Sequence, residues 1–465
     1  MGSSRMHIGM ALFFYPRGGS AQVARYLTRA LLAHGCEARV LSGSLGGVGE
    51  STHAPTFFRG RDVSVVDYTP AFEKWRKTGD PDLADVPFQP SYEHRHGVPD
   101  RGFDWTDEVS AERLHMAWRE VLTRAAERGA ALLHLHHLGV LQIAANGIGV
   151  PYVSHLHGTE LKFVERVLSG EAGPHGRWWV DRMREGAASS ARVVCISEHD
   201  RRLALDLLGL GPSDVEVVPN GVDTEVFRPR AMPSAERLAF WRRVLVDDPR
   251  GWDETGRVGS VRYGISDLDV FGTASDPSPV IIFVGRFLAF KRLPVLLEAF
   301  AEAQRSFSRR IPLVVWGGSP GEWEGEHPVT YVRRRGIRDV FFVGWRGHED
   351  LPTALAASDV FVAPSVGEPF GQVYLEAMAC GLPVIACASG GPLEIVETDS
   401  SAPTGWLVTP DDVGELASAM LVAVEDAEER SRRGRAAEAA VRRRWSWHRI
   451  AGRFISVYEQ SLLAT

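Results

Sequence analysis

The chain has 465 residues, of which 44% are apolar and 24% charged, and its formal net charge is −7. These values are ordinary for a globular enzyme of two or three domains. The negative charge argues against a general nucleic-acid binder, and no apolar run approaches the roughly 20 residues of a membrane helix. No secretory signal pattern is found either. We therefore expect a cytoplasmic protein without a nucleic-acid partner, and a membrane contact is disfavoured.

The cysteines are few and scattered. Their spacing matches neither a disulfide framework nor a zinc site. All of them fall in apolar strands or at helix ends, so we expect buried, reduced thiols and no structural metal. They are Cys36, Cys195, Cys380 and Cys387.

The first half of the chain predicts a parallel α/β domain. Residues 6–14 form a near-continuous apolar run, which is typical of a buried parallel strand. A turn containing Gly18 and Gly19 follows, and it is not the G-x-G-x-x-G pattern of dinucleotide-binding folds. Helices are then predicted over residues 21–31, 111–128 and 161–167. Strands are predicted over residues 36–41, 63–66, 130–137, 151–157, 191–197 and 215–222.

Histidines crowd two of these strands. Alternation along a strand places His134 and His136 on one face of the first, and His155 and His157 on one face of the second, while His137 ends the first strand. Histidines at the carboxyl ends of strands in an open α/β sheet more often contact a ligand than a metal. We therefore favour a ligand contact over a metal site.

Two stretches leave their roles open. Residues 230–278 suggest a helix followed by a loop, and a lid, a dimer contact and simple decoration are all compatible with them. The basic and aromatic residues Arg177, Trp178 and Trp179 can touch a membrane surface. We favour the interpretation that these tryptophans pack on the core while the arginine is solvated.

The second half repeats the α/β pattern. Strands are predicted over residues 280–285, 311–316, 339–343, 359–364 and 384–388, and a terminal helix over 445–463. Between the last two strands lies a helix over 371–380, preceded by Glu368 and containing Glu376. The amides of Phe370, Gly371 and Gln372 at its start carry a partial positive charge and suit a phosphate.

These residues resemble a known signature. The run Glu368-Pro369-Phe370-Gly371, with Glu376 and the later Gly390-Gly391, resembles the E-x7-E motif of retaining GT-B glycosyltransferases of family 4, the class of glycogen synthase and sucrose synthase. Three further matches are the loop 157–159 (His-Gly-Thr), the segment 219–223 (Pro-Asn-Gly-Val-Asp), and Arg286 with Lys291 in a G-R-x4-K pattern. The resemblance covers nearly the whole chain and is weakest at residues 43–110 and 230–278.

The resemblance implies an α/β fold of the GT-B type. Two Rossmann-like domains would have parallel sheets that face each other across a cleft. The N-terminal acceptor domain would span residues 1–229, completed by a terminal helix over 446–465 that crosses back to it. A hinge insertion would span 230–278, and the nucleotide-sugar domain 279–445.

The resemblance also implies roles for individual residues. Glu368 would contact the donor sugar and Glu376 the ribose, while Arg286 and Lys291 would grip the diphosphate and His157 would lie against the donor sugar. Lysine is otherwise rare in this chain, which makes Lys291 informative. The full predicted donor site is Gly18, Gly19, Arg286, Lys291, Gly344, Glu368, Pro369, Phe370, Gly371, Gln372 and Glu376, with His157, Glu368, Arg286 and Lys291 as the catalytic group and no metal.

The expected activity is metal-independent transfer of a hexose-type sugar with retention. UDP or GDP is favoured over ADP as the nucleotide, no cofactor is expected, and the acceptor is expected to be a small soluble molecule such as a specialised metabolite, a cyclitol or a thiol. A lipid-linked acceptor, a nucleotide-sugar epimerase and a non-catalytic binding protein are the alternatives. A pyridoxal-phosphate phosphorylase is disfavoured because no lysine follows Lys291. The sequence leaves open the sugar, the acceptor and the choice between monomer and homodimer.

Overall fold

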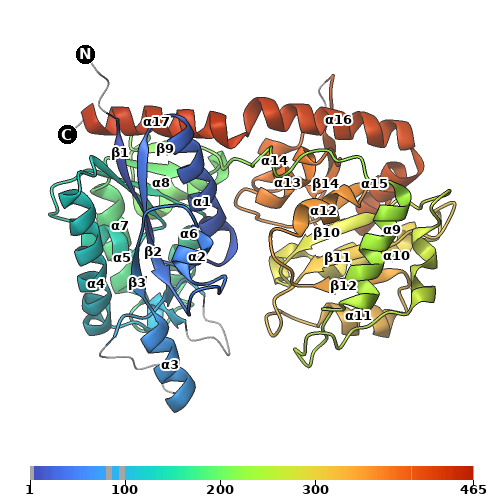
Figure 1. The fold of residues 1–465 in the computed structure, drawn as a ribbon, viewed down its shortest axis with the longest axis horizontal. Coiled ribbons are helices and arrows are strands. Elements are labelled where there is room, and N and C mark those ends of the chain that lie inside the picture. The colour runs from blue at the N-terminus through green and yellow to red at the C-terminus, as the bar shows by residue number, and fades with distance from the viewer. Residues whose placement is uncertain (1–4, 80–85, 94–99, 399–400, 464–465) are drawn as a thin grey trace. The chain divides into compact units, whose positions relative to one another are not determined.

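The computed structural model describes residues 5–79, 86–93, 100–398 and 401–463, and in it the chain forms two compact units (Figure 1). Unit 1 comprises Met1–Gly221 and Trp447–Thr465, and unit 2 comprises Val222–Ser446. Each unit contains a parallel sheet with helices packed on it, so the predicted α/β class with two Rossmann-like parts is confirmed.

The sheet of unit 1 has seven parallel strands in the order β3-β2-β1-β6-β7-β8-β9. Their bounds are β1 His7–Leu12, β2 Glu37–Ser44, β3 Val63–Asp67, β6 Leu132–His136, β7 Tyr152–His155, β8 Arg192–Cys195 and β9 Val215–Val217. The last of these is shorter than predicted because the chain reaches Pro219, which has no amide hydrogen to donate. A small pair, β4 Pro90–Ser91 and β5 Arg101–Gly102, lies apart from this sheet.

Helices cover both faces of this sheet. They are α1 Gly18–Ala33, α2 Ala54–Phe57, α3 Thr69–Thr78, α4 Glu108–Glu127, α5 Val140–Ala145, α6 Thr159–Leu168, α7 Gly176–Ala188, α8 Glu198–Leu208 and α17 Trp447–Leu463. Met10 and Leu12 of β1 pack in one core with α1 and α17, whereas Ala11 and Phe13 pack in the opposite core with α4 and α7. The terminal helix therefore completes unit 1, as the resemblance implies.

The sheet of unit 2 has six parallel strands in the order β12-β11-β10-β13-β14-β15. The strands are β10 Ile281–Gly285, β11 Leu313–Gly317, β12 Val340–Gly344, β13 Val360–Ala363, β14 Val384–Cys387 and β15 Gly405–Val408, the last of which was not predicted. The helices are α9 Ser234–Arg242, α10 Leu293–Ala303, α11 Pro328–Arg335, α12 Leu351–Ala356, α13 Gln372–Ala379, α14 Pro392–Ile395, α15 Val413–Glu425 and α16 Ala427–Arg444.

The strand order defines where each unit can bind a ligand. In the sheet of unit 1 the strands that follow β1 are first added on one side of it, and from β6 onward on its other side. The sheet of unit 2 does the same around β10, with β13 as the first strand on the other side. Each sheet therefore has a switch point, between β1 and β6 and between β10 and β13. Ligands of open α/β sheets bind at the carboxyl ends of the strands beside such a switch point.

Among the helices that the structure describes, none combines the length and apolar character needed to cross a membrane.

The segment 230–278 is an integral part of unit 2. Arg346, only 6% exposed, donates from Nη1 to the Asp248 carboxylate at 2.9 Å and from Nη2 to the Val244 carbonyl at 2.9 Å. The buried Trp252 donates from Nε1 to the Gly318 carbonyl at 2.8 Å. The segment thus packs on the carboxyl ends of β11 and β12.

Gly344 owes its identity to this packing. Its φ is 76°, and a methyl group on it would lie 2.0 Å from the Arg250 carbonyl oxygen. We expect Gly344→Ala to lower the free energy of unfolding of unit 2 by at least about 2 kcal/mol, because backbone strain and displaced packing add. Chemical denaturation followed by tryptophan fluorescence measures the loss.

Gly336→Ala is the matched control for this variant. Gly336 also has a positive φ, 64°, but a methyl group there would meet no atom within 4 Å. We expect it to lose only the left-handed strain of about 1 kcal/mol. Equal losses in the two variants would show that the contact with Arg250 does not explain Gly344.

Candidate functional site

An ion pair lies at the switch point of unit 2. Lys291 ends the short helix Ala289–Lys291 that follows β10, and Glu368 lies in the loop that follows β13. Lys291 is 9% exposed, and its Nζ lies 2.5 Å from Oε2 of Glu368. Val366 donates its amide to the Phe290 carbonyl at 2.8 Å, which joins the two loops. The structure therefore brings together two residues that were predicted from separate motifs.

The loop of Glu368 rests on Gly390 and Gly391. The Gly391 amide donates to the Glu368 carbonyl at 2.8 Å. A methyl group on Gly391 would lie 2.2 Å from the Phe370 carbonyl oxygen, and one on Gly390 would lie 2.5 Å from the Glu368 carbonyl oxygen. The double glycine is thus required for the close approach of two backbones, which sets the position of Glu368.

The helix α13 begins beside this ion pair. Its N-cap residue is Gly371, with φ of 104° and no side-chain capping bond, and its first helical residue is Gln372. Phe370 is buried, whereas Pro369 and the adjacent Glu368 are half-buried. Arg286, also half-buried, directly follows β10. The predicted amides and side chains of the diphosphate site therefore gather at one edge of the sheet of unit 2.

Glu376 has a partner that sequence reasoning missed. This carboxylate lies in α13 and is 4% exposed, and its Oε1 is 2.9 Å from Nε2 of His348. His348 lies in the loop between β12 and α12. It belongs to no motif and is far from Glu376 in the sequence, so no local signal could have paired them. The imidazole holds the orientation of the carboxylate that we expect to bind ribose.

In unit 1, the predicted glycines begin α1. Gly18 has a φ of 73°, which explains its identity, and a methyl group on either Gly18 or Gly19 would meet no atom within 4 Å. The preceding Arg17 makes no capping bond, and its guanidinium pairs with Asp100 and with the Tyr15 hydroxyl. The start of α1 therefore has open space on the side where side chains at these two positions would project.

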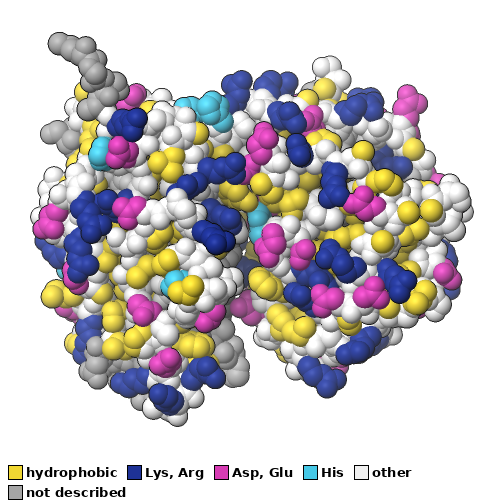
Figure 2. Space-filling model, viewed as in Figure 1, with side chains coloured by type: hydrophobic (Ala, Val, Ile, Leu, Met, Phe, Trp, Pro, Cys, Tyr) yellow, Lys and Arg dark blue, Asp and Glu magenta, His cyan; other side chains and the backbone are white. Residues whose placement is uncertain are grey.

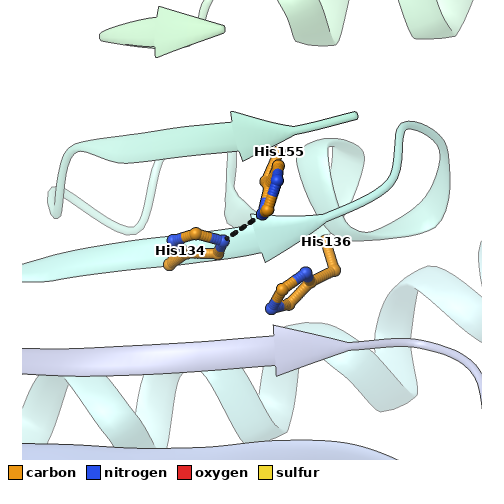
Figure 3. Close-up of side chains that lie close together, drawn as sticks. All are labelled: His134, His136 and His155. Atoms are coloured by element: carbon orange, nitrogen blue, oxygen red, sulfur yellow. Dashed lines mark hydrogen bonds between the residues drawn. The ribbon is translucent and has the colours of Figure 1, made fainter. Parts of the chain in front are cut away.

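Three of the histidines, His134, His136 and His155, are fully buried and lie close together (Figure 3). His134 and His155 contact α17. Nε2 of His134 lies 3.1 Å from Nδ1 of His155, and Nδ1 of His134 lies 2.6 Å from the Tyr458 hydroxyl of α17. Nε2 of His136 lies 3.0 Å from Sδ of Met10. Phe454 and Tyr458 of the terminal helix pack against this layer, so these rings lie in the core of unit 1.

His157 lies just beyond the end of the strand on which it was predicted. The strand β7 ends at His155, so strict alternation does not extend to His157, which lies half-buried in the turn before α6. Its Nε2 is 2.9 Å from Nδ1 of His136, and its amide donates to Oε1 of Glu160 at 2.7 Å. Oε2 of the buried Glu160 lies 3.2 Å from Nδ1 of His137.

Glu160 is a second residue that sequence reasoning missed. It is the second residue of α6, whose N-cap is Gly158, and no motif in the sequence marked it. Its carboxylate holds both the backbone of His157 and the ring of His137. It therefore supports the arrangement of both histidines at the carboxyl ends of β6 and β7.

The three buried histidines also have the spacing of a metal site. One ring nitrogen from each of His134, His136 and His155 lies within 4.8 Å of the others. Burial lowers the pKa of His134 to about 3 and holds the pKa of His136 and His155 well below the usual range, so the rings are neutral. Hydrogen bonds to Tyr458, Met10 and other imidazoles hold His134 and His136 in place, while Nε2 of His155 is buried without a hydrogen-bond partner.

Comparisons with known proteins agree with this fold. The model for glycosyl transferases group 1 matches residues 268–440, and the model for glycosyltransferase family 4 matches residues 17–226. A D-inositol 3-phosphate glycosyltransferase of Thermomonospora curvata is 31% identical over 342 residues, which cover 70% of each chain. A protein of the same name from Kineococcus radiotolerans is 29% identical over 355 residues, which cover 73% of each chain.

Two solved structures share the architecture over nearly the whole chain. HepE of Anabaena, in complex with UDP and glucose, gives a TM-score of 0.65 at 20% identity and covers 98% of this chain and 100% of that chain. Sucrose-phosphate synthase of Thermosynechococcus elongatus gives 0.64 at 20% identity and covers 99% and 100%. The two sheets and their switch points thus define a glycosyltransferase fold of the GT-B class. Within it, the chain belongs to the glycosyltransferases of group 1 and family 4.

The neutral histidines predict a pH-dependent stability. The unfolded chain binds a proton at His134 near pH 6.5, whereas the native side chain does so only at about pH 3. The unfolded state therefore holds more protons between these values, and the free energy of unfolding falls as the pH falls. We expect His134→Leu to remove about 1.4 kcal/mol per pH unit of this dependence between pH 4 and 6.

Denaturation at several pH values compares the variant with the wild type, so that the titration of carboxylates common to both cancels. The control is His448→Gln, which replaces an exposed histidine of α17 and should keep the wild-type slope. A wild-type slope in His134→Leu would contradict the buried, neutral state of this ring.

Proposed function

We propose that this glycosyltransferase moves a hexose-type sugar from a nucleoside-diphosphate sugar to a small soluble acceptor, with retention and without a metal. A phosphorylated cyclitol is the acceptor to test first, because relatives of 29–31% identity are named D-inositol 3-phosphate glycosyltransferases. UDP is the nucleotide to test first, since the HepE structures contain UDP or UDP-glucose. GDP and ADP follow in that order.

The observation that carries this proposal is the meeting of Lys291 and Glu368 beside the uncapped start of α13. A diphosphate placed there would accept hydrogen bonds from Lys291, Arg286 and the first amides of the helix. Glu368 would then orient the sugar hydroxyls and Glu376 the ribose. Because fixed cationic groups and amides supply the positive charge, the site needs no divalent ion to stabilise the leaving diphosphate.

The transfer step balances with these groups alone. The bond between the anomeric carbon and the diphosphate oxygen breaks, and its electron pair stays on the diphosphate. An acceptor hydroxyl forms the new bond from the same face, and its proton passes to the departing diphosphate oxygen. Lys291 and Arg286 stabilise the charge that grows on this leaving group, so their contacts strengthen as the bond breaks. The same-face attack preserves the anomeric configuration.

The patch that suggested a lipid-linked acceptor is largely occupied by packing. Trp179 is fully buried, and its Nε1 donates to the Thr106 carbonyl at 2.8 Å. Trp178 packs partly against the same core, with Arg182 over its ring. Figure 2 shows basic and acidic side chains interspersed over the face in view. These features favour a small acceptor over a membrane-bound one.

The first functional prediction concerns the nucleotide. We expect UDP, or GDP, to bind in the presence of a chelator, with an enthalpy measurable by titration calorimetry, because the site supplies its own cationic groups. A glycosyl transfer assay then identifies the donor and the acceptor, with nucleotide sugars that carry the nucleotide found to bind as donors and inositol phosphates as acceptors. Nuclear magnetic resonance of the product reports its anomeric configuration. Absence of binding by UDP, GDP and ADP would overturn the donor assignment. Release of an epimerised nucleotide sugar would instead identify an epimerase.

The second functional prediction concerns Lys291. We expect Lys291→Ala to lower kcat by about 100-fold or more, a loss of roughly 3 kcal/mol of transition-state stabilisation, because one charge on the leaving diphosphate is no longer neutralised. Arg286→Ala should behave similarly, and the double variant should lose less than the sum because both residues act on one group. Steady-state kinetics measures these losses.

Arg309→Ala is the matched control for the loss of a basic side chain in unit 2. The exposed ion pair of Arg309 with Asp276 precedes β11, at the amino end of the strands and away from the switch point. Its kcat should remain that of the wild type. Circular dichroism confirms that each variant folds, and a wild-type kcat in folded Lys291→Ala would remove this lysine from the mechanism.

A further inference from the structure

The side chain of His157 makes a hydrogen bond to another imidazole. Its Nε2 lies 2.9 Å from Nδ1 of His136, and the two rings stack at 25° with centroids 5.2 Å apart. A hydrogen bond between two neutral imidazoles needs an N–H on one nitrogen and a lone pair on the other. This contact alone is compatible with either ring as the donor.

Met10 determines which of the two rings, His136 or His157, donates the hydrogen bond between them. The other ring nitrogen of His136, Nε2, lies 3.0 Å from the Sδ atom of Met10. A thioether sulfur accepts hydrogen bonds and cannot donate one. Both side chains are 0% exposed, so water cannot serve as a substitute partner. The proton of His136 therefore lies on Nε2, and its Nδ1 carries the lone pair.

The opposite assignment leaves two buried acceptors facing each other. If His136 carried its proton on Nδ1, the lone pair of Nε2 would point at the lone pairs of sulfur, and neither atom would have a donor. Burial and the neighbouring histidines also hold the pKa of His136 and His157 well below the usual range, so a second proton on either ring is disfavoured. We call the two hydrogen bonds that join Met10, His136 and His157 the relay. Only one placement of the protons satisfies both bonds: His157 donates to His136, and His136 donates to Met10.

The geometry points to Met10 and His136 as positioning residues that fix His157 in the Nε2–H tautomer and so present its Nδ1 as a hydrogen-bond acceptor. Such an atom receives a hydroxyl or amine proton of a substrate and repels a phosphate oxygen. This inference rests on the proposed function and deepens it, because it assigns His157 to a sugar or polyol hydroxyl and not to the diphosphate. Glu160 supports the arrangement by holding the backbone of His157 at 2.7 Å.

The tautomer can be measured directly. The sample is the full-length protein with 15N-labelled histidine, in chelator, and His157 is assigned from the spectrum of His157→Gln. Long-range 1H–15N correlation should show a protonated Nε2 and a bare Nδ1. Met10→Leu keeps the size and apolar character of the side chain but removes the acceptor, so the signals of His157 should move toward a mixture of tautomers. A protonated Nδ1 in the wild type, or an unchanged pattern in Met10→Leu, would overturn the inference.

Kinetics on two variants of His136 provides the second test. In His136→Asn the amide oxygen stands near the position of Nδ1 and can still accept from His157, whereas His136→Leu has no acceptor. We expect His136→Leu to raise KM about tenfold, with near-wild-type kinetics in His136→Asn. A rise in the KM of the donor identifies a donor-sugar hydroxyl as the ligand of His157, and a rise in the KM of the acceptor identifies an acceptor hydroxyl. Equal kinetics in the two variants would contradict the role of His136.

Nucleoside-diphosphate binding separates this inference from the proposed function. By calorimetry, UDP or GDP should bind both His136 variants as it binds the wild type, because the diphosphate site belongs to unit 2. Failure of the wild type to bind any nucleotide would count against the proposed function. Normal nucleotide binding together with the wrong tautomer would overturn only the relay. Zinc added after removal of chelator should leave the His157 signals unchanged, and their loss would show a metal at His136 instead.

Discussion

A close approach between two backbones holds the candidate donor site of unit 2 in place. Gly390 and Gly391 lie so near the backbone of residues 368–370 that even a methyl group would collide with it. The loop that carries Glu368 rests on this contact, and the same loop is joined by a hydrogen bond from Val366 to the loop of Lys291. Because protein interiors are close-packed and transmit displacement, two residues without side chains position both charges of the site.

The same principle explains the segment 230–278. Gly344 ends β12 at a point where the Arg250 carbonyl comes close, and Arg346 is anchored to Asp248 and Val244 of that segment. An arginine that is almost fully buried needs such partners, since an unpaired buried charge is costly. The segment is therefore built into unit 2 beside the strand ends.

Unit 1 shows how a polar layer persists inside an apolar core. The rings of His134, His136 and His155 lie between the sheet and α17, where burial keeps them neutral. A neutral imidazole has one donor and one acceptor. Those of His134 and His136 pair with Tyr458, Met10 and other imidazoles, which avoids the cost of unsatisfied groups, whereas Nε2 of His155 is buried without a hydrogen-bond partner. The layer ends at His157, at the carboxyl end of β7. Packing in the core therefore determines which ring nitrogen of His157 carries the proton.

The sequence by itself determined the features that depend on neighbours along the chain. Apolar runs marked most strands of both sheets, because strand patterns and glycine turns are local signals. Two separate motifs also contained Lys291 and Glu368, which the fold brings together at the switch point of unit 2. The pairing of His348 with Glu376 and the relay from Met10 to His157 were decided only by the tertiary structure. In each case the partners lie on different strands or loops, and the fold alone brings their atoms within hydrogen-bonding distance. The burial of the histidines was likewise decided by α17, because a helix at the end of the chain covers strands formed near its beginning.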